Sequence, residues 1–309
     1  MPSWDEVQKA IRAAGSGHDI VRREALADLY NNTGRNVILY YSGWLEKQPL
    51  ADQGLAVDVN DSDKNGFMAT VHKLDRTKGL DLILHTPGGN VAATESIVDY
   101  LRAMFGTDIR VIVPQLAMSA GTMIALSAKS IVMGEHSSLG PTDPQLNGLP
   151  AHGVVEEFKR ASDEIRADPS KIAIWQPILA KYPPTFIGEC DKSIRWADNV
   201  VTDWLLSGMF ADIADETDRK AAVQKVMDEL ASHDQTLSHA RHISASKAIG
   251  LGIKVEMLED DKTLQDLVLT IHHACSQTCT ETPAFKIIEN HLGVAQIKMF
   301  IGPVQVRAT

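Results

Sequence analysis

Short apolar runs alternate with amphipathic segments through the first half of the chain. The runs are rich in β-branched residues and predict buried strands over residues 36–41, 80–85, 109–114 and 130–133. Between them, apolar residues recur at helical spacing over residues 66–74, 91–105 and 117–128. Strands that alternate with helices in this way indicate βα units around a largely parallel sheet. We therefore expect an α/β fold.

The pattern beyond residue 154 is mostly helical. Helical periodicity covers residues 154–165, 172–181, 189–206, 217–232 and 262–292, and a last strand is expected at 294–301. Residues 1–33 also have a charged, helical pattern. We accordingly predict three parts: a helical N-terminal arm at 1–34, the main domain at 35–255, and a helical C-terminal extension with a last strand at 256–309.

Composition narrows the possible partners. Hydrophobic residues make up 44% and charged residues 23% of the 309 residues, which is typical of a globular protein. The formal net charge of −10 argues against binding to nucleic acid or anionic membranes, because both need a basic surface. No segment is long and apolar enough for a signal peptide or a membrane span. We expect a soluble protein that stays in the cytoplasm.

The three cysteines do not predict a disulfide framework, because they are too few and too clustered. Two of them, Cys275 and Cys279, follow His272 and His273 at helical spacing, which allows a metal site as one interpretation. A zinc site would need a fourth ligand and the usual short paired spacings. We expect a buried helix here instead, with no metal, and the glycine patterns of nucleotide cofactor sites are absent from the turn described next.

The first motif with chemical meaning follows the predicted strand 80–85, where the chain runs Thr86-Pro87-Gly88-Gly89-Asn90. A strand, a Pro-Gly-Gly turn and a helix leave backbone N–H groups unpaired at the helix N-terminus. Glycines there let a substrate approach the main chain closely, as an oxyanion hole requires. A plain tight turn is the alternative interpretation of the same residues.

The second motif follows the next strand, where Ser119 opens a helix between Met118 and Ala120. Small neighbours allow a sharp strand-to-helix turn that presents the serine hydroxyl, as in the nucleophile elbow of α/β-hydrolases, although the Gly-x-Ser-x-Gly pattern is not present. The N–H of Ala120 would face the same space as that of Gly89. By itself, the serine is better explained as the N-cap of a tightly packed helix.

The two motifs together are more specific than either one. One helix and one strand separate Gly89 from Ser119, so a right-handed βαβ crossover places both turns at the same carboxyl edge of the sheet. We therefore expect the hydroxyl and the two N–H groups to converge.

From residue 80 to Gln145 the sequence resembles a ClpP-type serine protease domain. Within the ClpP/crotonase superfamily it is most similar to the serine dehydrogenase proteinase (SDH) family, which is related to signal peptide peptidase SppA. The pattern Ser-x-Leu-Gly-Pro-x-Asp-Pro-Gln at Ser137 to Gln145 carries this resemblance, as do the stretches HARHISASKAIGLGIKV and ETPAFKIIENHLG. It covers residues 35–295 and implies a spiral of βαβ units with helices that pack between subunits.

The resemblance also implies roles for individual residues. Ser119 would be the nucleophile, Gly89 and Ala120 the oxyanion donors, and Gly88 the residue that shapes the turn. ClpP proteases use a histidine after the serine helix as the base, but the corresponding neighbourhood here contains Asp143. SppA-like enzymes use a lysine from elsewhere in the fold.

The general base therefore stays open between several candidates. Lys159 ranks first, because its helix could fold back over the serine and burial could lower its pKa. Asp143 ranks second, although a lone carboxylate is a poor base and bracing the loop is the simpler role. The other candidates, each with a purely structural alternative, are Lys171, His85, His136 and His152.

The leading functional hypothesis is an ATP-independent serine endopeptidase that acylates Ser119 with a polypeptide substrate. The chain has no P-loop, so a separate partner would have to deliver folded substrates. We also expect a homo-oligomer, because the helical part beyond residue 154 has more apolar positions than one sheet can cover. The alternatives are a crotonase-like enzyme acting on acyl thioesters and a catalytically silent interaction protein with the same fold.

Overall fold

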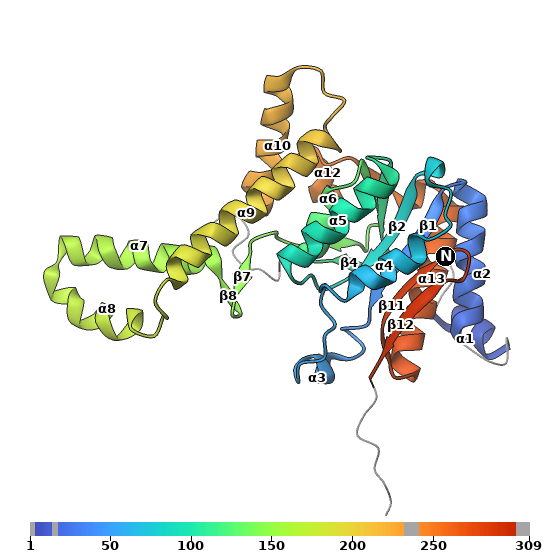
Figure 1. Ribbon diagram of the computed structural model, residues 1–309, viewed down its shortest axis with the longest axis horizontal. Helices are drawn as coiled ribbons and strands as arrows, with labels where there is room; N and C mark the ends of the chain where they lie inside the picture. Colours follow the sequence, from blue (N-terminus) through green and yellow to red (C-terminus); the bar gives the residue numbers. More distant parts are fainter. Residues whose placement is uncertain (1–3, 14–17, 232–240, 301–309) are drawn as a thin grey trace, which may run out of the picture.

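The computed structural model describes residues 4–13, 18–231 and 241–300. Its centre is a seven-stranded sheet in the order β10-β5-β3-β2-β1-β11-β12 (Figure 1). The strands from β10 to β1 are parallel to one another, and β11 and β12 are antiparallel to their neighbours. The strands are β1 Asn36–Ser42, β2 Leu80–His85, β3 Ile109–Val113, β5 Ser130–Met133, β10 Val255–Met257, β11 Ala284–Asn290 and β12 Ala295–Met299. The predicted α/β architecture with a largely parallel sheet is confirmed.

Helices cover both faces of this sheet. The helices are α1 Trp4–Ala13, α2 His18–Thr33, α3 Gln48–Ala51, α4 Asp63–Val71, α5 Val91–Phe105, α6 Ala120–Leu126, α7 Ala151–Ala167, α8 Ile172–Leu179, α9 Phe186–Ser207, α10 Glu216–Leu230, α12 Ala245–Leu251 and α13 Lys262–Glu281. Short 3-10 turns lie at Arg76–Lys78, Pro169–Lys171 and Leu258–Asp260. In the described part of the chain, no helix is long and apolar enough to cross a bilayer.

The central strands divide their side chains between two cores. Leu82 and Leu84 of β2 pack with α5, α6 and α9 on one face, whereas Ile83 packs with α2 and α13 on the other. This alternation is the two-residue period of a strand. Because both faces are covered, β1 and β2 are apolar along most of their length and completely buried.

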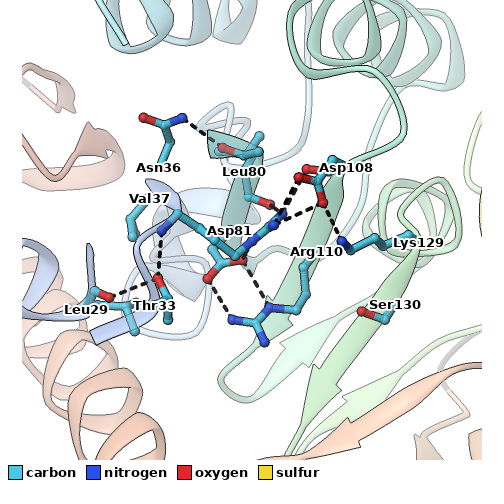
Figure 2. Close-up of polar contacts among 12 residues, drawn as sticks. Leu29, Thr33, Asn36, Val37, Leu80, Asp81, Asp108, Arg110, Lys129 and Ser130 are labelled. Atoms are coloured by element: carbon cyan, nitrogen blue, oxygen red, sulfur yellow. Dashed lines mark hydrogen bonds and ion pairs between the residues drawn. The ribbon is translucent and has the colours of Figure 1, made fainter. Parts of the chain in front are cut away.

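One buried charge interrupts β2 at the edge of the sheet where the parallel strands begin. Asp81 is inaccessible to solvent, and its carboxylate accepts hydrogen bonds from Arg35 (2.7 Å) and Arg110 (2.8 and 3.0 Å). Figure 2 shows Arg110 on Asp81, with Lys129 on Asp108 beside them. The paired arginines compensate the desolvation of the carboxylate and tie β1, β2 and β3 together.

The helices α7 and α8 project away from the sheet, and α9 leads back from them to the main body (Figure 1). This part, residues 151–207, has a small core of its own around Ala151, Val154, Phe186 and Cys190. The helix α8 remains largely exposed although it is apolar, with Ile174 62% accessible. We call residues 151–179 the projecting arm.

Several predicted boundaries differ from those of the structure, and two of the differences have a local physical cause. The helix expected at 262–292 ends at Glu281, because Pro283 cannot continue it, and residues 284–290 form strand β11 beside β1. Lys286 obscured this strand in the sequence, since a buried strand rarely carries a charge. The helix expected at 117–128 begins only at Ala120, because Leu116 and Ala117 form the short strand β4.

Candidate active site

The turns that follow β2 and β3 lie against each other. The Thr86 N–H donates to Leu116 O, and the Met118 N–H donates to Thr86 O, each at 3.0 Å. A Cβ atom built on Gly88 would lie 2.7 Å from the Ser119 Cβ atom and 3.1 Å from the Ala120 nitrogen. The structure therefore joins the two motifs at one edge of the sheet, as their spacing predicts, and only a residue without a side chain fits at position 88.

Ser119 has an unusual backbone conformation for a residue with a side chain, with φ 50° and ψ −114°. It occupies the N-cap position of α6, but its side chain makes no capping hydrogen bond. Ser119 is thus the N-cap residue by position, as that interpretation has it, but its side chain does not cap the helix. A sharp strand-to-helix turn with a strained serine is the geometry of a nucleophile elbow, in which the hydroxyl is left available.

The Gly88–Gly89 peptide is oriented by a contact from outside the motif. The Val59 N–H donates to Gly88 O (2.7 Å), and the Asn90 N–H donates to Val59 O (2.9 Å). In a trans peptide the C=O and the following N–H point in opposite directions, so the Gly89 N–H points away from Val59. Gly89 itself is exposed, and a Cβ atom there would lie 2.4 Å from the Val59 nitrogen.

The helix N-terminus adds a second donor beside the first. Ala120 is the first residue of α6, where backbone N–H groups have no partner within the helix and the helix dipole favours negative charge. The N–H of Ala120, like that of Gly89, is thus a candidate donor to an anionic group.

A cavity of about 500 Å³ opens in front of Ser119 and Gly89. Its walls come from the starts of α5 and α6, the loop after β6 (Ser138–Leu139) and the middle of α9. The lining is mainly apolar, with hydroxyl and amide groups between the apolar side chains: Pro87, Asn90, Val91, Ala92, Met123, Thr142, Pro144, Gln145, Leu146, Ser193 and Trp196. Such a cavity suits an uncharged group.

The loop after β6 is held firmly against the serine turn. The Gly140 N–H donates to the Thr122 hydroxyl, which itself donates to Ala117 O. The Thr142 N–H donates to Leu230 O (2.8 Å), so α10 supports the same loop. The strand β6 also pairs with β4 and with β9 (Ile243–Ser244), while β7 (Gln145–Leu146) and β8 (Leu149–Pro150) form a hairpin beside the cavity.

Comparison with known proteins assigns the chain to a family. The sequence matches the ClpP-like SDH-type serine proteinases over residues 55–269, more than half of its length. The chain belongs to this family. It is a serine proteinase family with a ClpP-like fold, which agrees with the resemblance carried by residues 137–145.

The curated relatives are archaeal. The uncharacterized protein MJ0137 of Methanocaldococcus jannaschii is 30% identical over 212 residues, covering 68% of this chain and 65% of the relative. The uncharacterized protein MJ1495 of the same organism is 36% identical over 126 residues, covering 39% and 42%. This chain thus spans less than two thirds of either relative.

Among solved structures, one similar chain is a serine-to-alanine mutant of the 1510-N membrane-bound stomatin-specific protease. Its TM-score is 0.38 and its sequence identity 17%, with 68% of this chain and 79% of that chain covered.

The two leading candidates for the general base, Asp143 and Lys159, lie in different parts of the structure. Asp143 is completely buried between Thr142 and Pro144, which both line the cavity. Lys159 is exposed on the projecting arm and is not among the residues that line the cavity.

The other candidate bases of this member of the SDH-type family also lie apart from the cavity lining. His85 stacks on Tyr41 on the opposite face of the sheet and contacts Ser42 O and Gln115 Oε1, each at 3.1 Å. Burial lowers the pKa of His85 to about 4, so this imidazole is neutral. Lys171 pairs with Glu164, His136 is exposed, and His152 lies near Asp198.

The sequence analysis did not identify the site residues that lie far along the chain from the two motifs. Trp196 and Ser193 come from α9, and the Trp196 indole N–H donates to Glu95 Oε2 (2.9 Å) on α5. Val59 comes from the segment between the strand expected at 36–41 and the helix expected at 66–74. None of the three stands in a recognisable motif, because contacts between distant elements leave no local signal in one sequence.

Among the described residues, no group of three histidine, cysteine or acidic side chains is placed to hold a metal ion. Cys275 and Cys279 are buried in the core between α2 and α13, and burial raises the pKa of the Cys279 thiol to about 12.

Proposed function

We propose that this SDH-type serine proteinase is an ATP-independent endopeptidase that forms an acyl-enzyme on Ser119. The Ser119 hydroxyl oxygen attacks the carbonyl carbon of the scissile peptide bond, and its proton passes to a general base. The carbonyl oxygen becomes an oxyanion that accepts hydrogen bonds from the N–H groups of Gly89 and Ala120. The base then protonates the leaving amine, and water hydrolyses the ester.

The observation that carries this proposal is the strained elbow at Ser119, next to a glycine turn whose N–H is directed away from Val59. The cost of such a backbone conformation is about 1–3 kcal/mol, which a fold retains where function requires it. In a crotonase-like enzyme Ser119 would take no part in the reaction, so the function would not require its strained backbone conformation.

We propose Lys159 as the base, supplied by the projecting arm of a second copy. Lys159 of the same chain is exposed and does not line the cavity that holds Ser119, so it would have to come from another copy. Contact between subunits would remove the amine from water, and removal from water disfavours the charged form of an amine. The exposed apolar residues Ile172 and Ile174 on the arm are compatible with such contact. Asp143 is the second choice, as the base or as its orienting partner.

The catalytically silent alternative has one observation in its favour. The described residues that line the cavity include no lysine, arginine or histidine. A protein of this kind would bind a polypeptide without cleaving it.

Covalent labelling distinguishes these possibilities. A fluorophosphonate should label the wild-type protein, and mass spectrometry should locate the adduct on the peptide that contains Ser119. The Ser119→Ala variant should not be labelled, whereas Ser127→Ala, at the other end of α6, should be labelled normally. A folded wild-type protein that resists the reagent would refute the endopeptidase and favour the silent alternative.

A further inference from the structure

The segment that orients the oxyanion turn is itself held by a buried ionic cluster. Asp63, the first residue of α4, is completely buried, as is Lys286 in the middle of β11. The Lys286 ammonium donates to both carboxylate oxygens of Asp63, at 3.0 and 3.1 Å. The Tyr40 hydroxyl donates to the same carboxylate (2.8 Å), and the Asn60 N–H donates to it at 3.0 Å.

Lys286 also donates a hydrogen bond to a group outside the Asp63 carboxylate. Its ammonium donates to the main-chain oxygen of Asp58 at 2.6 Å. Asp58 immediately precedes Val59, whose N–H holds Gly88 O at 2.7 Å. One buried ammonium thus fixes residues 58–60 at two points, through the Asp58 carbonyl and through the Asp63 carboxylate that holds the Asn60 N–H.

The consequence follows from peptide geometry. Because the Gly88 carbonyl and the Gly89 N–H belong to one planar unit, a shift of Val59 would rotate the Gly89 N–H away from the oxyanion. Gly89 has no side chain that could restrict this rotation. The direction of the donor therefore depends on the position of the Val59 backbone.

We propose that Lys286 is a positioning residue for the oxyanion donor, acting through Asp58 and Val59 on the Gly88–Gly89 peptide. This proposal rests on the endopeptidase proposed above. Stability by itself does not require a lysine at this position, because well-packed apolar residues replace buried ion pairs without loss in many proteins. An apolar side chain could not, however, donate a hydrogen bond to the Asp58 carbonyl.

Lys298 provides a matched control within the same cluster. Its ammonium contacts Asp63 Oδ1 (2.5 Å) and Ser62 Oγ (2.6 Å) from β12, but no contact with the Asp58 carbonyl accompanies them. Both lysines thus bind the Asp63 carboxylate, but of the two lysines it is Lys286 that donates to the Asp58 carbonyl oxygen.

The test compares Lys286→Met with Lys298→Met at a temperature where circular dichroism shows both variants folded. We expect fluorophosphonate labelling of Ser119 to be at least tenfold slower in Lys286→Met and within twofold of the wild type in Lys298→Met, because small displacements of a catalytic group have large effects on rate. With a peptide substrate, the loss should fall on kcat rather than KM. Equal labelling rates in the two variants would overturn the proposal.

Amide hydrogen exchange separates this proposal from the proposed function. The amides of Val59 and Asn90 should exchange at least tenfold faster in Lys286→Met and unchanged in Lys298→Met. If the wild type is not labelled at all, the endopeptidase fails, and equal exchange in both variants would still overturn the positioning role. Should Lys286→Met not fold, the double variant Lys286→Met with Asp63→Asn removes both charges and serves in its place.

Discussion

The strain at Ser119 can be measured by replacing the serine with glycine and with alanine. Both changes remove the nucleophile, so both variants should lack fluorophosphonate labelling. Alanine retains a Cβ atom and therefore retains the strain of φ 50° and ψ −114°. Glycine tolerates this conformation, because it has no Cβ atom to clash with the backbone. The difference in stability between the two variants therefore reports the strain itself.

The magnitude follows from two opposing terms. Relief of the strained conformation should stabilise the glycine variant by about 1–3 kcal/mol. The greater backbone entropy of glycine in the unfolded chain opposes this by about 0.5–1 kcal/mol. We expect Ser119→Gly to be more stable than Ser119→Ala by about 1 kcal/mol, equivalent to a rise in Tm of about 1.5 °C for a chain of 309 residues. Ser119→Ala should differ little from the wild type, because the serine side chain makes no capping bond.

Urea unfolding followed by circular dichroism gives the free energy of unfolding of each variant. The control is Ser127 at the other end of α6, where φ is −73° and glycine relieves no strain. At that position the glycine variant should be less stable than the alanine variant. If Ser119→Gly were no more stable than Ser119→Ala, the serine would not be strained, and the argument for a nucleophile elbow would fail.

Three further predictions concern the turn, the base and acid stability. Gly89→Ala should abolish labelling because its Cβ atom would lie 2.4 Å from the Val59 nitrogen, whereas Gly34→Ala, with no atom within 4 Å, should leave labelling intact; equal effects would contradict the role of the turn. Lys159→Met should abolish labelling and turnover while Lys171→Met does not, and the wild-type rate should rise above neutral pH; an active Lys159→Met with an inactive Asp143→Asn would place the base in the 140–143 loop. Burial lowers the pKa of His85 to about 4, from about 6.5 in the unfolded chain. Between these pH values the unfolded chain therefore binds more protons than the folded protein does. The free energy of unfolding should fall by about 3 kcal/mol as the pH drops from 6.5 to 4. Urea unfolding of His85→Gln should show a smaller loss over this range, and an unchanged slope would refute the assignment.

Local sequence determined the elements that carry the reaction. Apolar runs of β-branched residues predicted β1, β2, β3 and β5, and their alternation with helices predicted a largely parallel sheet. The Pro-Gly-Gly turn and the serine between small residues were recognisable because each needs a backbone conformation or a close approach that few residues permit. Such requirements are local, so they are visible in one sequence.

The tertiary structure decided the parts that depend on distant partners. Lys286 made β11 hard to recognise as a buried strand in the sequence. The partner that compensates its charge, Asp63, lies more than two hundred residues earlier in the chain. Val59, which orients the oxyanion turn, has no feature that separates it from any loop valine. Lys159 looked like a helix residue near the serine, yet its helix projects away from the body of the protein (Figure 1). Hydrogen bonds between remote segments, and the burial that accompanies them, arise only when the chain folds. The sequence pattern identifies the residues, but it does not show which of them come into contact.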